Sequence, residues 1–138
     1  MPENEPWEYT LYIPDDVRAV IVARRTLRLI LTMHGLIRLV DTAELLAAEL
    51  VSNAVRHTKG SAALRVRWAV GVLRIGAWDA DPEPPEPPGE LGLLADVGAE
   101  EGRGLALVEA CADVWGWQPS ARGGNRGKFV WCELGSAG

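Results

Sequence analysis

Apolar and polar residues alternate with a period of two near the start of the chain and with a longer period after it. In residues 7–13 every second side chain is apolar, which is typical of a strand with one buried face. Pro14 ends this strand, and Asp15 is the predicted capping residue of the helix that follows. Apolar residues in that helix recur with a period near 3.6 until Gly35, its predicted stop, so one helix face is expected to be buried.

A second helix and a hairpin are predicted in the middle of the chain. Asp41 and Glu44 have the spacing of a capping box and predict a helix that runs to about His57. Residues 63–70 and 72–78 alternate as strands do and are separated by one glycine, which predicts a hairpin. Because the gap is a single residue, the strand ends are expected to give up residues to the turn.

The segment after Asp79 is rich in proline and glycine and interrupts the periodic pattern. It reads Ala-Asp-Pro-Glu-Pro-Pro-Glu-Pro-Pro-Gly, and its prolines exclude a helix interior and a central strand. One interpretation is a linker between two domains, but about 80 residues before it and about 50 after it would form two small cores. We therefore interpret residues 1–138 as one domain with a long functional loop.

The last part of the chain predicts one more helix and two more strands. The helix is expected over residues 104–112, and the strands over residues 113–117 and 128–134 around a glycine-rich turn. The resulting order lacks the strict strand and helix alternation of a parallel doubly wound fold. The predicted fold class is α+β: a two-layer sandwich with five strands in a mixed, mostly antiparallel sheet and three helices on one face.

The composition is that of a globular protein with an acidic balance. The chain has 138 residues, with 14 lysines and arginines against 19 aspartates and glutamates, which gives a net charge of −5. An acidic balance argues against the cationic surface that drives nonspecific nucleic-acid binding. The most apolar helical segment carries several arginines, and residues 1–4 are acidic with no apolar segment after them. We therefore expect a cytoplasmic protein without a membrane span or a secretory signal.

A polar row follows one side of the second predicted helix. Glu49, Asn53 and His57 are four residues apart, so they stack on one helix face. The neighbouring row is apolar, which places the polar row at the edge of the core; it consists of Leu46, Leu50 and Ala54. Two interpretations stay open, a solvated stripe and a functional set of carboxylate, amide and imidazole.

Asp79 continues the small and apolar face of its predicted strand. Counting back by two gives Ala77, Ile75 and Leu73, so the carboxylate is predicted to point inward. A buried carboxylate needs a donor, either from the protein or from a ligand such as one with an exocyclic amine. The alternative is an aspartate just past the strand end that bonds to its own turn.

Gly102 and Gly104 precede an apolar helical segment. Glycines let the backbone approach a ligand closely, and the first N–H groups of a helix are free to bind phosphates. A plain helix start is the alternative. The chain has no Walker lysine pattern, no Rossmann motif after a strand, no hydrolase elbow and no metal-ligand spacing. Cys111 and Cys132 are predicted to be small buried apolar residues.

Taken in order, these motifs resemble the N, G1 and G2 boxes of the histidine-kinase-like ATPases, the GHKL superfamily with the Bergerat fold. The motifs are Glu49 with Asn53, Asp79 at a strand end, and Gly102 with Gly104 at a helix start. The resemblance extends over nearly the whole chain. Within the superfamily, the segments ELVSNAVRH and DADPEPP are most similar to the anti-sigma factor serine/threonine kinases.

The resemblance implies a site for ATP and Mg²⁺. In this site Asp79 would accept a hydrogen bond from the adenine amino group, and Asn53 would hold Mg²⁺ through its amide oxygen. Glu49 would be the catalytic residue, a general base acting on an incoming serine hydroxyl, and residues 80–101 would form the ATP lid. The residues that would wrap the triphosphate with backbone N–H groups are Gly102, Arg103, Gly104 and Leu105.

The resemblance also implies a reaction and partners. The expected reaction is phosphorylation of a serine or threonine on an anti-sigma factor antagonist, and the expected second partner is a sigma factor. No direct contact with nucleic acid or membrane is expected. Relatives often pair, so a homodimer and a monomer both stay open. Two other functions stay open: a non-catalytic module whose affinity for a partner responds to nucleotide, and a scaffold with an empty site.

Some positions depart from the pattern of the family. Asp81 and Glu83 stand where glycines are usual after the adenine-binding aspartate. Phe129 stands near the position of a usual threonine in the last strand, which removes one hydroxyl expected near the base. Three arginines of the first predicted helix could dock an acidic partner or form a solvated face; they are Arg24, Arg25 and Arg28.

Overall fold

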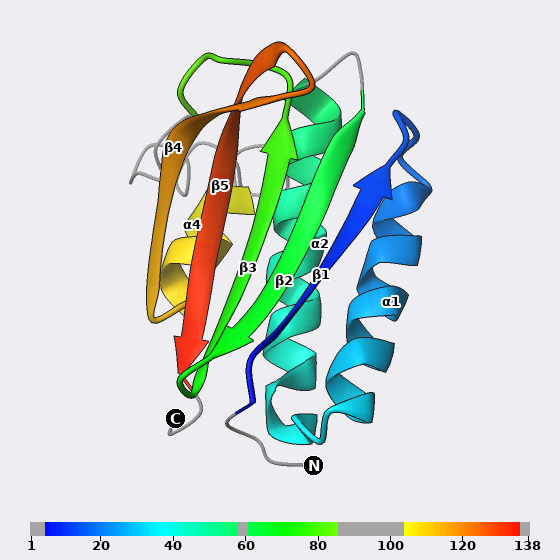
Figure 1. Ribbon diagram of the computed structural model, residues 1–138, viewed down its shortest axis with the longest axis vertical. Coiled ribbons are helices and arrows are strands. Elements are labelled where there is room, and N and C mark those ends of the chain that lie inside the picture. The colour runs from blue at the N-terminus through cyan, green and yellow to red at the C-terminus, as the bar shows by residue number, and fades with distance from the viewer. Residues whose placement is uncertain (1–4, 58–60, 86–103, 136–138) are drawn as a thin grey trace.

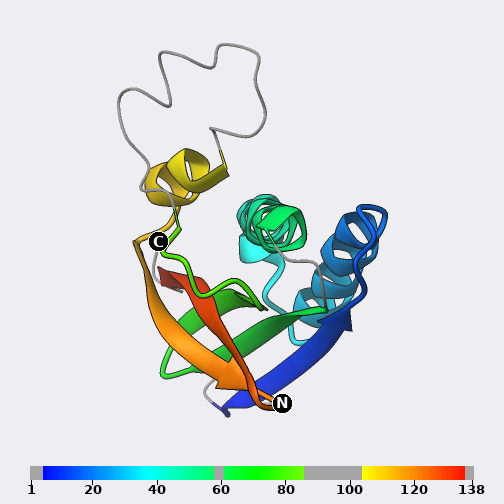
Figure 2. The same cartoon turned by 90° about the horizontal axis from the view of Figure 1, so that it is seen from above.

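The computed structural model describes residues 5–57, 61–85 and 104–135, which form a two-layer α+β fold. Five antiparallel strands form one sheet in the order β1-β2-β3-β5-β4, and the helices cover one of its faces (Figure 1, Figure 2). The predicted α+β class is confirmed, and the sheet, predicted to be mixed and mostly antiparallel, is antiparallel at each pairing of the described strands. The strands are β1 (Trp7–Ile13), β2 (Ala62–Ala69), β3 (Val72–Asp79), β4 (Val114–Arg122) and β5 (Asn125–Gly135). The helices are α1 (Ala19–Met33), the 3₁₀ turn η1 (Ile37–Leu39), α2 (Val40–His57) and α4 (Gly104–Cys111).

The pairing of β3 with β5 joins the parts of the chain before and after the proline-rich segment. The two strands pair from Val72 opposite Gly135 to Asp79 opposite Lys128. On either side, β2 pairs with β3 and β4 pairs with β5. One sheet therefore contains strands from both parts of the chain, which is the arrangement that a long internal loop requires.

The main core lies between the helices and one face of the sheet. Each large apolar side chain buried there stabilises the fold by about 1.5–3 kcal/mol. Successive side chains of a strand point to opposite faces, so the alternate positions of β3 point away from the helices. The helix-facing side chains at the centre of the core are at most 2% exposed and include Leu73, Ile75 and Ala77 of β3 with Leu46 and Leu50 of α2.

Helix α1 begins later than the sequence pattern predicts. Asp15 is not its capping residue, because the helix begins at Ala19, directly after Arg18. Asp16 instead accepts hydrogen bonds from the backbone N–H of Arg18, at 2.8 Å, and from its guanidinium. The hydrogen bond from the Arg18 side chain is the main cause that lowers the pKa of Asp16 to about 2. This local pair holds a turn ahead of the helix.

Helix α2 continues from η1 instead of starting at a capping box. Asp41 is its second residue, so it does not occupy the N-cap position. Glu44 is paired with α1, because Arg28 Nη1 donates to Glu44 Oε1 at 3.0 Å. The predicted capping box is therefore wrong, while the predicted helix end at His57 is confirmed.

Two tight turns need left-handed backbone at both central residues. Val70 and Gly71 have φ values of 52° and 75°, and Gly123 and Gly124 have φ values of 54° and 82°. Positive φ at both positions is typical of type I′ hairpin turns, whose twist matches that of the flanking strands. β5 starts earlier than predicted, because Gly127 lies in the strand and not in the turn.

Replacing Val70 is expected to stabilise the protein. This β-branched residue is 91% exposed and occupies the left-handed region, which costs about 1–2 kcal/mol for a residue with a Cβ and less for asparagine. Val70→Asn is expected to raise the free energy of unfolding by about 1 kcal/mol in urea denaturation. Val114→Asn, at an exposed strand position, is the control and should give no gain. Unchanged or lower stability of Val70→Asn would contradict strain in this turn.

The two free thiols are expected to differ in reactivity. Cys132 lies on the helix-facing side of β5 with no exposed surface, whereas Cys111 at the end of α4 is half-buried. Burial raises the pKa of Cys132 to about 12, and the charge of Glu133 contributes. Because the thiolate is the reactive form, iodoacetamide at about pH 8 should alkylate Cys111 in the folded protein and Cys132 only after denaturation. Mass spectrometry checks this, and equal rates at both thiols would disprove it.

Candidate functional site

A buried ion pair joins the ends of β3 and β5. Asp79 is the last residue of β3, and its register partner on β5 is Lys128. Their side chains are 0% and 2% exposed, and Lys128 Nζ donates to Asp79 Oδ1 at 3.0 Å. The prediction that the Asp79 carboxylate points inward is confirmed.

The residues after β3 fold back onto this pair. The backbone N–H of Asp81 donates to Asp79 Oδ1 at 2.9 Å, and the Asp81 carbonyl accepts from Lys128 Nζ at 3.1 Å. The backbone N–H of Glu83 in turn donates to Asp81 Oδ1 at 3.0 Å. Asp81 therefore fixes the start of the loop to the ion pair. Asp79 also bonds to its own turn, as one interpretation of the sequence expected.

The second oxygen of the Asp79 carboxylate lacks a hydrogen bond. Asp79 Oδ2 is buried and has no hydrogen-bond partner among the described residues. A buried polar atom without a partner costs about 1–3 kcal/mol, so such an atom is uncommon in a folded protein. It is an acceptor that a ligand with an N–H group could satisfy.

The surroundings act on the protonation of Asp79 in opposite directions. Burial is the largest effect and raises the pKa of this carboxyl group above its ordinary value of 3.8. The hydrogen bonds from Lys128 and from the Asp81 N–H lower the pKa in part. Lys128 therefore favours the charged carboxylate, which is the form that accepts hydrogen bonds through both oxygens.

Gly127 allows the close contact between the two strands at this point. A Cβ atom on Gly127 would overlap the carbonyl oxygen of Asp79 and would lie 2.8 Å from the Trp78 ring. Any side chain at this position would push β5 away from the end of β3. The glycine next to Lys128 thus helps to bring its ammonium group to the carboxylate.

The polar row of α2 lies at the edge of the core, with Asn53 fully inside. Asn53 is 7% exposed and Glu49 is half-buried, while the neighbouring Leu46, Leu50 and Ala54 are buried. A solvated stripe is therefore the wrong interpretation for Asn53. The side chain of His57 lies outside the described residues.

The elements that carry the three motifs point toward one end of the molecule. β3 and α2 both run toward this end, and α4 starts there (Figure 1). α2 and α4 lie on the same face of the sheet (Figure 2). Gly104 is the first residue of α4 and Leu105 is 7% exposed. Gly102 and Arg103, and most of the predicted lid over residues 80–101, lie outside the described residues, since only residues 80–85 of it are described.

Phe129 lies away from the candidate site, and Lys128 is the residue that the sequence reasoning missed. Phe129 pairs with Trp78, on the face of the sheet opposite Asp79. Lys128 instead shares the helix-facing side with Val130 and Cys132. The signal that could have found it is the period of two, since a lysine continues the inward, apolar positions of β5.

Oxygen-bearing side chains of α2 lie near one another at the edge of the core. Among the described residues, no group of three His, Cys, Asp or Glu side chains is placed to hold a metal ion. Mg²⁺ prefers oxygen ligands and is often bound by one or two protein groups together with phosphates. The Asn53 amide oxygen is a donor of that kind, and the Glu49 carboxylate lies one helical turn before it.

The arginines of α1 lie on the surface. Arg24 and Arg25 are exposed, and Arg28 is shared between Glu44, at 3.0 Å, and Asp41, at 4.0 Å. Two carboxylates thus neutralise part of this cluster, which favours a solvated face over a docking site for an acidic partner.

Comparison of the sequence with protein-family models and with curated proteins gives no significant match. Within the part of the chain that the structure describes, no helix has both the length and the apolar character to cross a lipid bilayer.

Removing the lysine of the buried pair is expected to destabilise the protein in a pH-dependent way. Lys128→Met leaves the buried Asp79 carboxylate without its cation, which should cost about 3–5 kcal/mol near neutral pH. It also raises the pKa of Asp79 further. When the pKa of a carboxyl group is higher in the folded than in the unfolded state, the free energy of unfolding falls as the pH rises above the unfolded-state pKa, here about 3.8. The loss of stability in Lys128→Met should therefore be larger at pH 8 than at pH 5.

Urea denaturation at both pH values measures this loss. The matched control is Lys128→Met combined with Asp79→Leu, which replaces both charges by apolar groups and should recover most of the stability. A loss that is the same at the two pH values, or a double variant no better than Lys128→Met, would show that the pair does not act through charge.

Proposed function

We propose that this protein is a Bergerat-type ATP-binding protein kinase, similar to the anti-sigma factor serine/threonine kinases. The observation that carries the proposal is the buried Asp79 Oδ2, an acceptor with no partner among the described residues. It supports recognition of an exocyclic amine, which adenine carries. The order of the motifs and their direction toward one end of the fold add to this support.

The residues of this chain have distinct proposed roles. Asp79 Oδ2 accepts a hydrogen bond from the adenine amino group, while Oδ1 stays bonded to Lys128 and Asp81. Asn53 would hold Mg²⁺ through its amide oxygen, and residues 102–105 would hold the phosphates with backbone N–H groups. Mg²⁺, when bound, neutralises charge on the transferred phosphoryl group.

Glu49 is the proposed general base. It precedes Asn53 by one helical turn, so its carboxylate lies on the same side of α2 as the magnesium ligand. A half-buried carboxylate there can take the proton from a serine or threonine hydroxyl as the hydroxyl attacks the γ-phosphate. The leaving group is ADP, and the product is a phosphoserine or phosphothreonine.

The proposed substrate and partners follow from the resemblance. The acceptor would be a serine or threonine of an anti-sigma factor antagonist, and a sigma factor would be a second, sequestered partner. A cytoplasmic location and a homodimer belong to the same proposal. None of these requires direct contact with nucleic acid or a membrane.

A non-catalytic module is the second candidate, and one observation favours it. Asp81 is fixed by the Asp79 carboxylate and by Lys128, at a position where the family usually has a flexible glycine. A fixed loop start would limit the rearrangement that phosphate binding and transfer need. In this alternative, nucleotide sets the affinity for a partner and no phosphate is transferred.

The first test is calorimetric titration with ATP and Mg²⁺. Wild type is expected to bind ATP, and Asp79→Leu combined with Lys128→Met should weaken binding by about tenfold or more, because the base loses its acceptor while no unpaired charge is buried. Asp41→Asn, at a carboxylate that is 98% exposed, is the matched control. Absence of saturable binding by the folded wild type would leave only a scaffold with an empty site.

The second test separates kinase from module. Glu49→Gln is expected to lower phosphoryl transfer to a cognate antagonist by about 10²–10⁴-fold while ATP affinity stays near that of wild type. Glu109→Gln, at an exposed position of α4, is the control and should transfer phosphate normally. Transfer undiminished in Glu49→Gln would refute the general base, and ATP binding without any transfer by wild type would favour the module.

A further inference from the structure

The face of the sheet opposite the helices carries a concentration of arginines. Successive strand residues alternate between faces, so the register places four arginines on this side, one of which belongs to β4 and the others to β2 and β3. The acidic residues that share the face are Glu8 and Glu133, so the face is cationic on a chain with net charge −5. The arginines are Arg65, Arg67, Arg74 and Arg122.

Aromatic rings hold three of these guanidinium groups in place. The guanidinium carbon of Arg65 lies 5.2 Å from the centre of the Phe129 ring, and that of Arg74 lies 4.2 Å from Trp131. Arg122 lies 5.3 Å from the Tyr12 ring. Cation–π contacts of this kind restrict the side chains, so less entropy is lost when the guanidinium groups bind an anion.

The aromatic rings lie flat because glycines are beneath them. A Cβ atom at Gly76 would overlap the Phe129 ring, and one at Gly116 would lie 2.7 Å from Trp131. The Phe129 and Trp131 rings therefore pack directly on the backbone of the sheet, and Arg65 and Arg74 lie over these rings. Phe129 is 8% exposed and Trp78 is 5% exposed, so both rings are already covered.

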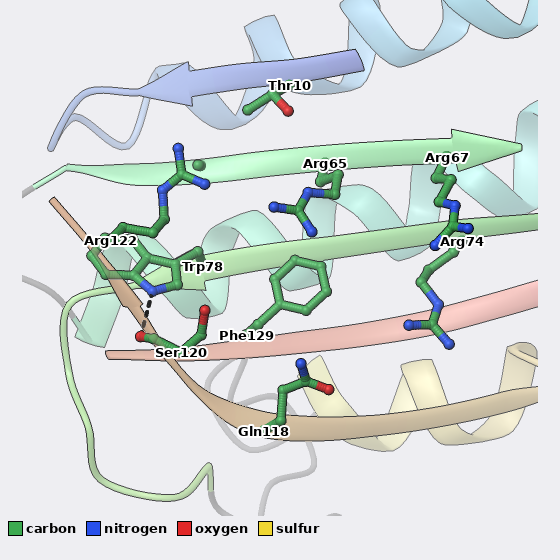
Figure 3. A pocket seen from close by; sticks show the side chains of 10 residues that line it. Thr10, Arg65, Arg67, Arg74, Trp78, Gln118, Ser120, Arg122 and Phe129 are labelled. Atoms are coloured by element: carbon green, nitrogen blue, oxygen red, sulfur yellow. Dashed lines mark hydrogen bonds between the residues drawn. The ribbon is translucent and has the colours of Figure 1, made fainter. Parts of the chain in front are cut away.

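A shallow cavity of about 100 Å³ follows this row of arginines. Arg67 and Arg74 lie at one end, Arg65 and Phe129 in the middle, and Arg122 over Trp78 at the other end (Figure 3). Its volume is well below the roughly 300–1,000 Å³ of sites that enclose a drug-sized molecule. The cavity can take anionic groups in a row but does not enclose a nucleotide.

The charges of this face are only partly satisfied within the chain. Arg67 and Arg74 are direct cross-strand partners, and like charges in that position destabilise a sheet. Glu133 pairs with Arg74 at 2.7 Å, and Glu8 lies 3.6 Å from Arg65 Nε. Arg65 Nε is buried and has no hydrogen-bond partner among the described residues. An additional anion beside Arg67 and Arg74 would reduce their repulsion.

The spacing of the arginines fits an extended peptide. Arg65 and Arg67 are two residues apart on β2. Two residues before Arg65 is Ala63, which pairs with Trp78, and the guanidinium group of Arg122 lies 5.9 Å from the centre of the Trp78 ring. Arg65 and Arg67 are therefore about 6.6–6.8 Å apart along β2. Alternate side chains of an extended peptide have the same repeat.

Other occupants fit this face less well. Single-stranded nucleic acid binds through bases stacked on exposed aromatic rings, but here guanidinium groups already cover the rings. A second copy of the chain would place four arginines against four arginines. Carboxylates, in contrast, match the guanidinium fork and can bind it through two hydrogen bonds.

We propose that the open face of the sheet binds an extended acidic segment of a partner protein, with carboxylates at every second residue paired to the arginine row. This surface is on the opposite side of the sheet from Asp79, so its role does not depend on the proposed kinase function. The partner segment lies on the open face of the sheet and runs along β2. Arg67 is the most exposed of the four arginines and binds the first carboxylate.

Fluorescence anisotropy with two synthetic peptides tests the proposal. One labelled peptide alternates glutamate and threonine, and the other has the same composition with all glutamates in one block. The alternating peptide should bind about tenfold more tightly, and binding should weaken as salt rises. Arg65→Gln with Arg67→Gln should abolish the preference, whereas Arg24→Gln with Arg25→Gln on α1, the same change in charge, should keep it.

Each other outcome overturns the proposal. Equal binding of the two peptides would show diffuse charge attraction, and tighter binding of an oligothymidylate that competes with the peptide would assign the face to nucleic acid. Self-association in sedimentation that the β2 variant abolishes would assign it to a second copy. If circular dichroism shows that the double variant is unfolded, Arg67→Gln alone, at an exposed position, gives the decisive comparison.

Discussion

A carboxylate and an ammonium group buried against each other hold together the end of the sheet from which the proline-rich segment departs. Neither ion is tolerable there alone, because an isolated buried charge costs several kcal/mol. Together they join two strands that are distant in the sequence, and they hold Asp81 through its backbone. The buried oxygen that is left over is the basis of the proposed adenine recognition. The stability of this corner and its chemistry therefore depend on one ion pair.

The sheet separates two kinds of surface. Its helix-facing side is apolar along most of each strand and becomes polar only at one end, at Asp79 and Lys128. Its other side carries aromatic rings and arginines over much of its length. The alternation of side chains along a strand allows this separation, because neighbouring residues face opposite sides. Trp78 and Asp79 are an example, since one lies on the arginine face and the other in the proposed nucleotide site.

The sequence was sufficient to predict features that depend on periodicity. The strand over residues 7–13 and the inward direction of Asp79 follow from a period of two. The period of 3.6 places Asn53 beside an apolar row, but the structure and not the sequence shows that Asn53 is buried. Helix starts were predicted less well, although Asp15 and Asp41 are typical capping residues. The contact between Asp16 and Arg18 holds a turn ahead of α1, and the η1 turn leads directly into α2.

The period of two extends to Lys128, but its neighbours in the sequence conceal that signal. The glycines before it predict a turn, and a residue next to a turn is expected to be exposed. Only the long hairpin, which pairs Gly127 with Ser120, brings Lys128 inside. The roles of Gly102 and Arg103 stay predictions, since they lie outside the described residues.

The packing of Phe129 over Gly76 has a consequence for how this sequence can vary. The ring occupies the space where any other residue at position 76 would place its first carbon. A larger residue at position 76 is therefore acceptable only if the residue at position 129 is smaller than phenylalanine. Conversely, a smaller residue at position 129 exposes the backbone of β3 unless position 76 carries a side chain that fills the space. In related chains the two positions should change together, so that a threonine in the last strand would be accompanied by a side chain on β3.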